Sequence, residues 1–163
     1  MSLLHSLSSH ELNLITIHLT AQDVMKLWLC GNGELQDKLT LGVTNFKYSW
    51  PFRSCIQLPS TLLQKLASLQ TLSIGSDYVL GYCPSLKPQL LPSSLTRLHL
   101  SIQDVFQVLA SSSVTLRTAC PLLRNNTLKG TYMREEVFSQ LPLNLDTLEV
   151  DCSSLLLCLP LHF

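Results

Sequence analysis

Side chains that could bind a metal ion or act as nucleophiles are spread along this chain rather than grouped. The six cysteines are separated by 25, 28, 37, 32 and 6 residues without a Cys-x-x-Cys pair, and no two of the five histidines are four residues apart. Metal sites usually begin from ligands paired at short spacing. We therefore expect neither a metal ion nor a cofactor. An even number of cysteines suits disulfides in an exported protein, but without a signal sequence we expect buried, reduced thiols.

Groups with catalytic potential also lack partners in the sequence. Glu135 and Glu136 form the only adjacent pair of carboxylates, and His99 stands alone on a predicted strand. A nucleophile needs a base within hydrogen-bond reach and a third group that orients the base. The sequence contains no Gly-x-Ser-x-Gly motif and no glycine-rich phosphate loop. We expect solvated glutamates, a surface histidine and a chain that is not an enzyme.

One spacing of apolar residues recurs along the chain, and it predicts the elements that would position these side chains. The pattern apolar-x-x-apolar-x-apolar occurs at Val43/Phe46/Tyr48, Leu69/Leu72/Ile74, Leu95/Leu98/Leu100 and Leu145/Leu148/Val150. The copies start 26, 26 and 50 residues apart, and because 50 is two steps of 25 we expect five copies with the fourth eroded. Units of this length bury their apolar face only by stacking on neighbours. A four-helix bundle is the alternative for leucines at helical steps, but eight prolines argue against long helices.

Polar residues alternate with the apolar ones inside each predicted strand. Because successive side chains of a strand point to opposite faces, the residues that flank the middle apolar position must face away from the core. These residues are Asn45, Lys47, Thr71, Ser73, Arg97, His99, Thr147 and Glu149. We expect them to form a surface that binds a protein client, with Arg97 and His99 at its centre.

The N-terminal third predicts short helices instead. Ser8 or Ser9 is a plausible N-cap for a helix that carries Leu12, Ile15 and Leu19 at helical steps. Thr20 with Asp23 forms a capping-box pattern at the start of a second helix, with Val24, Leu27 and Trp28 on it. Gly31-Asn32-Gly33 interrupts the chain, and a third short helix with Leu35, Leu39 and Leu41 leads into the first strand.

The composition narrows the classes of partner. Lys plus Arg and Asp plus Glu number 11 each, so we expect no binding to nucleic acid or to an anionic membrane, which would require a basic excess. The apolar stretch at residues 155–161 is far shorter than the ~20 residues of a membrane span. The N-terminus lacks a basic n-region, so we expect an intracellular protein, cytoplasmic or nuclear. We interpret the sequon-like Asn125-Asn126-Thr127 as a loop.

The recurring pattern resembles the leucine-rich repeat, whose consensus runs L-x-x-L-x-L-x-x-N/C. Two copies also share a Leu-Pro start, Leu91-Pro92 and Leu141-Pro142. Where the family has its Asn or Cys, this chain has Asp77, Gln103 and Ser153. The resemblance implies an α/β leucine-rich-repeat solenoid of about five repeats over residues 41–163, with a short helical N-terminal cap over residues 1–40.

The N-terminal helices carry a set of residues at a characteristic spacing, namely Leu7, Glu11-Leu12, Ile15, Leu19, Asp23-Val24, Leu27 and Cys30. This set resembles an F-box, the motif that docks on the small adaptor subunit of cullin-based ubiquitin ligases. The Leu-Trp-Leu-Cys-Gly run at residues 27–31, followed by Gly-Val-Thr at residues 42–44, resembles fungal F-box-like leucine-rich-repeat proteins. Ser8 replaces the usual Pro, and the Trp that follows the Cys is missing. The resemblance implies that Leu7, Leu12, Ile15, Leu19, Val24 and Leu27 bind the adaptor, and that the chain is a ligase substrate receptor. The alternative is a stand-alone binding scaffold whose helices only cap the repeats.

The last copy of the pattern ends thirteen residues before the C-terminus, at Val150. Repeat arrays normally end in a unit with a polar outer face, because an uncovered strand invites association. No such unit follows, and the remaining segment is rich in leucine. We expect the chain to self-associate or aggregate through this end, or to be a truncated relative of a longer protein.

Overall fold

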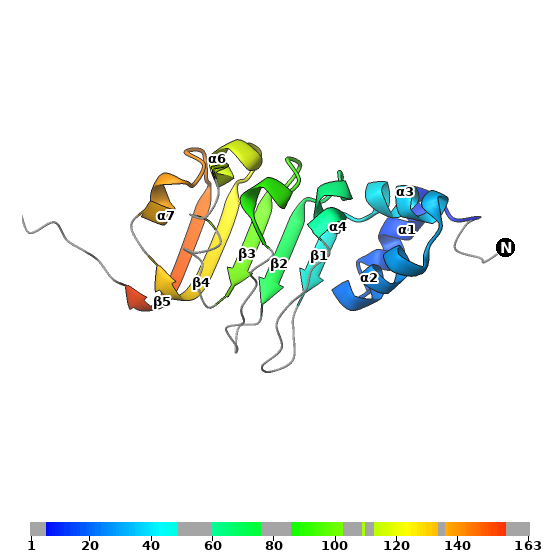
Figure 1. Ribbon diagram of the computed structural model, residues 1–163, viewed down its shortest axis with the longest axis horizontal. Helices are drawn as coiled ribbons and strands as arrows, with labels where there is room; N and C mark the ends of the chain where they lie inside the picture. Colours follow the sequence, from blue (N-terminus) through cyan, green and yellow to red (C-terminus); the bar gives the residue numbers. More distant parts are fainter. Residues whose placement is uncertain are drawn as a thin grey trace, which may run out of the picture.

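The computed structural model describes residues 6–48, 60–75, 86–102, 109, 113–133 and 136–155, and every structural statement below concerns these residues. They form one parallel sheet with three helices at one end (Figure 1). The strands are β1 (Asn45–Tyr48), β2 (Thr71–Gly75), β3 (Arg97–Ser101), β4 (Asn125–Met133) and β5 (Thr147–Leu155). Their order in the sheet is their order in the chain. The predicted α/β class, with five parallel strands and N-terminal helices, is confirmed.

The four strands β2 to β5 start in the same way, and this common start fixes the register of the sheet. The carbonyl of Thr44 accepts hydrogen bonds from two consecutive N–H groups at the start of β2, at 2.8 and 3.0 Å. The carbonyls of Gln70, Thr96 and Arg124 do the same at the starts of β3, β4 and β5. As a result Phe46, Leu72, Leu98, Asn126 and Leu148 lie side by side in one row on the buried face of the sheet.

The fourth copy of the apolar pattern is the one that supplies β4. It reads Leu123, Asn126, Leu128, so an amide stands where the other copies have Phe or Leu. The strands begin 26, 26, 28 and 22 residues apart, and the expected even division of the last 50 residues into two steps of 25 is wrong. The interpretation of Asn125-Asn126-Thr127 as a loop is also wrong, because all three residues lie in β4. Asn125, Asn126 and Thr127 are polar, so the sequence did not indicate β4, although this strand pairs with β3 on one side and β5 on the other.

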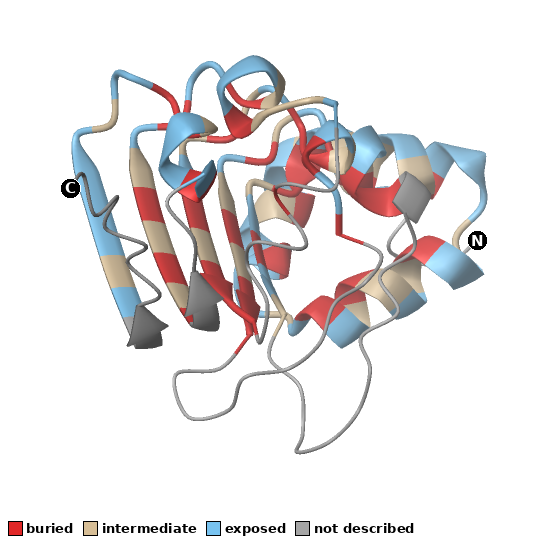
Figure 2. Cartoon of the chain, turned by 60° about the vertical axis from the view of Figure 1, so that its left-hand side comes forward, coloured by how far each residue is buried: buried red, intermediate tan, exposed pale blue. Residues whose placement is uncertain are grey.

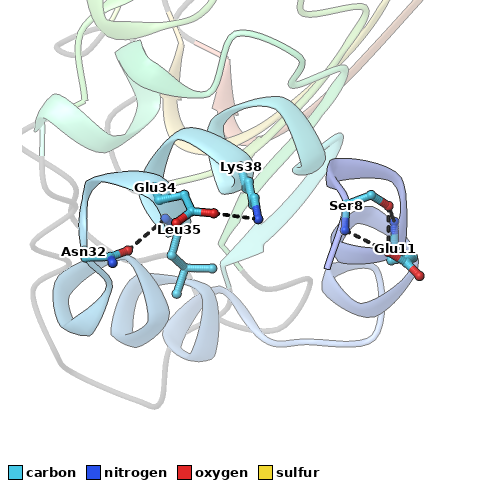
Figure 3. Close-up of polar contacts among 6 residues, drawn as sticks. All are labelled: Ser8, Glu11, Asn32, Glu34, Leu35 and Lys38. Carbon is cyan, nitrogen blue, oxygen red and sulfur yellow. Dashed lines mark hydrogen bonds and ion pairs between the residues drawn. The ribbon is translucent and has the colours of Figure 1, made fainter. Parts of the chain in front are cut away.

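Three helices precede the sheet, and their caps follow the predicted residues. Helix α1 (Ser9–Thr16) has Ser8 as its N-cap and α2 (Ala21–Cys30) has Thr20, and both caps form complete capping boxes. Helix α3 (Gly33–Gly42) has Asn32, whose side-chain oxygen accepts a hydrogen bond from the N–H of Leu35 at 3.1 Å. Figure 3 shows this cap beside the Glu34–Lys38 ion pair of 3.0 Å, and the reciprocal contacts of Ser8 and Glu11.

Polar contacts also join the three helices to one another and to the sheet. The Gln36 side chain of α3 donates to the carbonyl of Trp28 in α2 at 2.9 Å. The Thr44 hydroxyl, just before β1, donates to the side-chain oxygen of Asn13 in α1 at 2.9 Å. The Nζ atom of Lys65, the last residue of helix α4 (Ser60–Lys65) after β1, lies 5.6 Å from the centre of the Trp28 ring in α2, a cation–π contact. The helices are therefore fixed against the β1 end.

Short helices on the connections cover the buried face of the sheet. They are α4 (Ser60–Lys65), the 3-10 helix η2 (Pro88–Leu90), α6 (Leu116–Ala119) and α7 (Glu136–Ser139). Their buried residues, such as Leu62, Leu116 and Val137, belong to one hydrophobic cluster that runs from Leu12 to Leu141. Burial alternates along β2 and β3, so one face of the sheet is core and the other is open (Figure 2).

One glycine in the sheet is required by its backbone. Gly75, at the end of β2, has φ of 111°, a conformation that L side chains rarely adopt. A Cβ atom at this position would also lie 2.1 Å from the carbonyl oxygen of Ser101 in β3. Only glycine therefore allows β2 and β3 to approach each other at this point.

Candidate protein-binding face of the sheet

The eight residues predicted to bind a client lie on the open face of the sheet. Cross-strand pairing arranges the face in rows, and two polar residues of β4, Asn125 and Thr127, complete the two rows that contain the predicted residues. The first row is Asn45, Thr71, Arg97, Asn125 and Thr147, and the second row is Lys47, Ser73, His99, Thr127 and Glu149. All ten side chains are exposed or half-buried. We call these ten residues the open-face rows.

Hydrogen bonds between neighbouring strands hold the side chains of β4 and β5 in these rows. The Thr147 hydroxyl donates to the side-chain oxygen of Asn125 at 2.6 Å, and the Thr127 hydroxyl donates to a carboxylate oxygen of Glu149 at 3.3 Å. Sequence reasoning missed Asn125 and Thr127 because β4 lacked the complete apolar pattern. The available signal was Leu128, which keeps its place two residues after Asn126.

Charge is distributed unevenly over the open face. Cations occur toward β1 and in the middle of the sheet, at Lys47 and Arg97, and a further one, Lys129, follows Thr127 in β4. Carboxylates occur on β5, at Glu149 and Asp151, which is paired in register with Lys129. The face therefore changes from positive to negative along the strand order. A partner that lies across it would be oriented by this charge difference.

The candidate metal-binding and catalytic side chains can be placed only in part. Within the described ranges no three His, Cys, Asp or Glu side chains come close enough together to hold a metal ion. His99 lies on β3 as predicted, and Glu136 is exposed at the start of α7, while Glu135 lies outside the described residues. The predicted positions Asp77 and Gln103 also lie outside them, and the side chain of Ser153 is not described.

The two cysteines with described side chains, Cys30 and Cys120, are both free thiols. Cys30 is exposed at the end of α2, whereas Cys120 is buried with its sulfur 3.8 Å from the carbonyl oxygen of Pro92. Burial disfavours the thiolate and raises the pKa of Cys120 to about 12. Cys120 is therefore a core side chain without nucleophilic character.

The N-terminal helices divide the six predicted adaptor-binding residues between core and surface. Leu12 and Val24 are buried inside the chain's own core, so they are not available for direct contact in this fold. Leu7, Leu19 and Leu27 are half-buried and pack against that core, and Ile15 is exposed. Periodicity alone could not separate these roles, because α1 carries apolar residues around much of its circumference.

Three large apolar side chains that the sequence analysis did not single out are also exposed on or beside these helices, namely Leu14, Ile17 and Leu29. Leu41, which was predicted on the third helix with Leu35 and Leu39, is exposed whereas the other two are buried. Leu14 and Ile15 lie in the last turn of α1 and Ile17 is its C-cap, so three large apolar side chains are exposed close together in the sequence at this end of the helix.

Comparisons with known proteins do not assign this chain to a family. No protein-family model, no curated protein and no solved structure matches it. In the part of the chain that the structure describes, no helix has both the length and the apolar character needed to cross a membrane. The functional assignment therefore rests on the open face and on the N-terminal helices.

Proposed function

We propose that this chain is a protein–protein interaction module of the leucine-rich-repeat type, which binds a protein client on the open face of its sheet. The observation that carries the proposal is the alignment of ten polar or charged residues in two rows across all five strands. A parallel sheet is usually covered on both faces. A sheet of this kind with one polar, open face is suited to holding another macromolecule.

The side chains of the open face fit recognition rather than catalysis. Small hydroxyl and amide groups at Thr71, Ser73, Asn125 and Thr127 occupy its middle, and charged groups lie beside them and toward both ends. Such groups donate and accept hydrogen bonds at rigid backbone positions, so they give specificity at low entropic cost. The proposed function therefore involves binding without a chemical step.

A client contact can be tested by site-specific photo-crosslinking. A photoreactive residue is placed at Ser73, His99 or Thr127 on the open face, and at Gln64 or Leu122 as controls, since both controls are exposed and lie outside the strands. We expect the open-face positions to give one shared adduct, identified by mass spectrometry, and the control positions to lack it. Equal labelling from both sets would contradict a client site on this face.

The same site can be weakened by substitution. Replacing Arg97 and His99 together by Ala removes the central charge and ring but no buried side chain. We expect loss of the shared adduct with almost no change in the thermal midpoint. Unfolding of this variant would show that the two positions support the core rather than a client.

We further propose that the N-terminal helices dock the small adaptor subunit of a cullin ubiquitin ligase, which would make the chain an F-box-like substrate receptor. Support comes from the exposed apolar residues Leu14, Ile15 and Ile17, which a helical cap alone does not require. The burial of Leu12 and Val24 supports the alternative, a stand-alone scaffold whose helices only close the β1 end. The two functions differ in a single binding partner.

Binding to purified adaptor subunit separates these two functions. Ile15→Asp places a charge on the proposed contact while leaving the core intact, and Leu143→Asp is the matched control on a leucine far along the chain. We expect adaptor binding by the wild type and by Leu143→Asp, and none by Ile15→Asp. A correctly folded wild-type chain that retains no adaptor would leave only the scaffold function.

A further inference from the structure

The outer edge of β5 has no partner strand among the residues that the structure describes. Within the described ranges β5 pairs with β4 alone, and it is the last strand in the order of the sheet. Its exposed position is visible in Figure 2, where β5 lies outermost and is coloured largely as exposed. An edge strand presents a row of N–H and C=O groups that can pair with another chain.

Hydrogen bonding to β4 determines which backbone N–H and C=O groups of β5 point to its outer edge. The N–H of Thr147 donates to the carbonyl of Arg124, so Thr147 directs its backbone toward β4. Because backbone groups alternate sides along a parallel strand, Leu148 and Val150 direct their N–H and C=O groups to the outer edge. These two residues therefore supply the backbone contacts for an added strand.

The side chains of the same two residues lack the cover that their neighbours have. Leu148 is 43% exposed, whereas Leu98 in the same row is 2% exposed. Val150 is half-buried, whereas Leu100 and Leu128 in its row are fully buried. An added strand with apolar side chains on this face would complete both rows.

The open-face side of β5 is acidic. Glu149 and Asp151 are exposed, and Asp146 lies immediately before the strand. Lys129 is the cation opposite Asp151 in the β4 register, so carboxylates are in excess here. Alternate residues of an added strand would lie directly beside Glu149 and Asp151.

This charge pattern discriminates between occupants of the edge. A second copy of the chain, paired antiparallel about Val150, would place its own Glu149 and Asp151 opposite those of the first copy. Like charges directly opposite each other destabilise a strand pair, whereas opposite charges stabilise it. Cationic side chains in an added strand would gain the favourable pairs.

We propose that the β5 edge binds an extended segment of another protein by strand addition, and that this segment alternates apolar with Lys or Arg residues. Backbone pairing would supply affinity, and the apolar and acidic rows would supply specificity. The site lies along the β5 edge and shares only Glu149 with the open-face rows, so it adds a second partner to the proposed function.

A synthetic peptide tests the proposal directly. The probe is a blocked, fluorescently labelled peptide of about eight residues, the length of a typical strand, which alternates valine with lysine. The control peptide alternates valine with glutamate. We expect the lysine peptide to bind the full chain saturably and to weaken as salt is added, and the glutamate peptide not to bind.

Two variants of the chain localise the binding to β5. Leu148→Pro removes an outward N–H and no hydrogen bond to β4, and Leu148→Ala is its control because it keeps the N–H. Glu149→Lys with Asp151→Lys reverses the charge of the edge, and Asp37→Lys with Glu136→Lys makes the same change in net charge at exposed positions elsewhere. We expect Leu148→Pro and the edge reversal each to weaken binding at least about tenfold. Leu148→Ala should lose less affinity than Leu148→Pro, because it shortens one apolar contact but keeps the N–H, and the Asp37→Lys, Glu136→Lys control should bind like the wild type.

Several outcomes would overturn the proposal. Equal binding of the two peptides would remove the charge basis, and unchanged binding by the edge-reversal variant would place the peptide elsewhere. Concentration-dependent dimerisation through β5 that the lysine peptide does not displace would assign the edge to a second copy. Because both reversed residues are exposed, their variant keeps the test decisive even where Leu148→Pro fails to fold.

Discussion

The two ends of the sheet carry the same apolar pattern in opposite environments. Phe46 in β1 and Leu148 in β5 belong to one row, yet Phe46 is 1% exposed and Leu148 is 43% exposed. The difference comes from the helices at the β1 end, because α2 lies beside β1 and buries Val24 and Trp28 in the shared core. An apolar residue in this fold is therefore a core residue only where a neighbouring element covers it.

The two ends also differ in what they offer to partners. The β1 end is closed by three helices with complete polar caps and exposes apolar side chains on their outer surface. The β5 end exposes backbone groups and an acidic row. The first surface fits a helical or apolar contact, and the second fits a strand.

The largest effect is expected when the side chains at the two ends of the row, Phe46 and Leu148, are each replaced by Ala and their losses of unfolding free energy are compared. Phe46→Ala should lower the free energy of unfolding by about 3–5 kcal/mol, the range for a buried Phe. Leu148→Ala should lower it by about 1 kcal/mol or less, since the side chain is already half in water. Urea unfolding of both variants measures the difference, and equal losses would remove the contrast between the ends.

The middle of the row should respond like the closed end. Leu98→Ala is expected to cost about 2–5 kcal/mol, because Leu98 is buried between strands on both sides. Leu143 precedes β5 and is 85% exposed. Leu143→Ala should therefore change the free energy of unfolding by no more than about 0.5 kcal/mol. Thermal or urea unfolding distinguishes the two, and similar losses would show that the strand register is wrong.

Replacing Asn126, the buried polar residue in β4 next to β5, is expected to stabilise the fold. The side chain of Asn126 is buried, and neither its amide nitrogen nor its amide oxygen has a hydrogen-bond partner. Asn126→Leu restores the row and should raise the free energy of unfolding by about 1–2 kcal/mol, because an unsatisfied buried amide is removed. Asn125→Leu, on the open face of the same strand, should give no such gain. A loss of stability in Asn126→Leu would show that the amide makes a stabilising interaction.

The smallest effect concerns the caps at the closed end and depends on pH. Hydrogen bonds from Ser8 lower the pKa of the Glu11 carboxyl, and hydrogen bonds from Thr20 lower that of Asp23. A carboxyl whose pKa is lower in the folded state stabilises the fold above its unfolded-state pKa, and this contribution is lost as the pH falls through the folded-state pKa. Unfolding midpoints measured from about pH 7 to about pH 3 should therefore fall less in a Glu11→Gln, Asp23→Asn variant than in the wild type. Identical pH profiles would show that the caps contribute nothing.

The sequence predicted the closed end and the middle of the sheet better than the β4–β5 end. Ser8, Thr20 and Asp23 marked the helix starts because their side chains interact with backbone groups a few residues away. The motifs at Leu69 and Leu95 predicted their strands because both keep all three apolar positions. Asn126 broke the fourth motif, which keeps only Leu123 and Leu128, and β4 nevertheless pairs with β3 and β5.

The candidate site also contains residues that the sequence placed and residues whose roles it left open. Alternation in complete strands placed Thr71, Ser73, Arg97 and His99 on the open face, because side-chain direction follows from the backbone alone. The roles of Leu12 and Ile15 could not be separated in this way. Which apolar side of α1 is buried depends on where α3 and the sheet lie, and that is a tertiary property.

The sequential strand order has a consequence for the time at which each surface forms. Each strand pairs with the strand made just before it, so a chain that emerges from the ribosome N-terminus first can complete its closed end before β5 is synthesised. Every strand edge is then open only until the next strand arrives. Among the described residues no strand follows β5, so its outer edge is the one that this order of pairing leaves last.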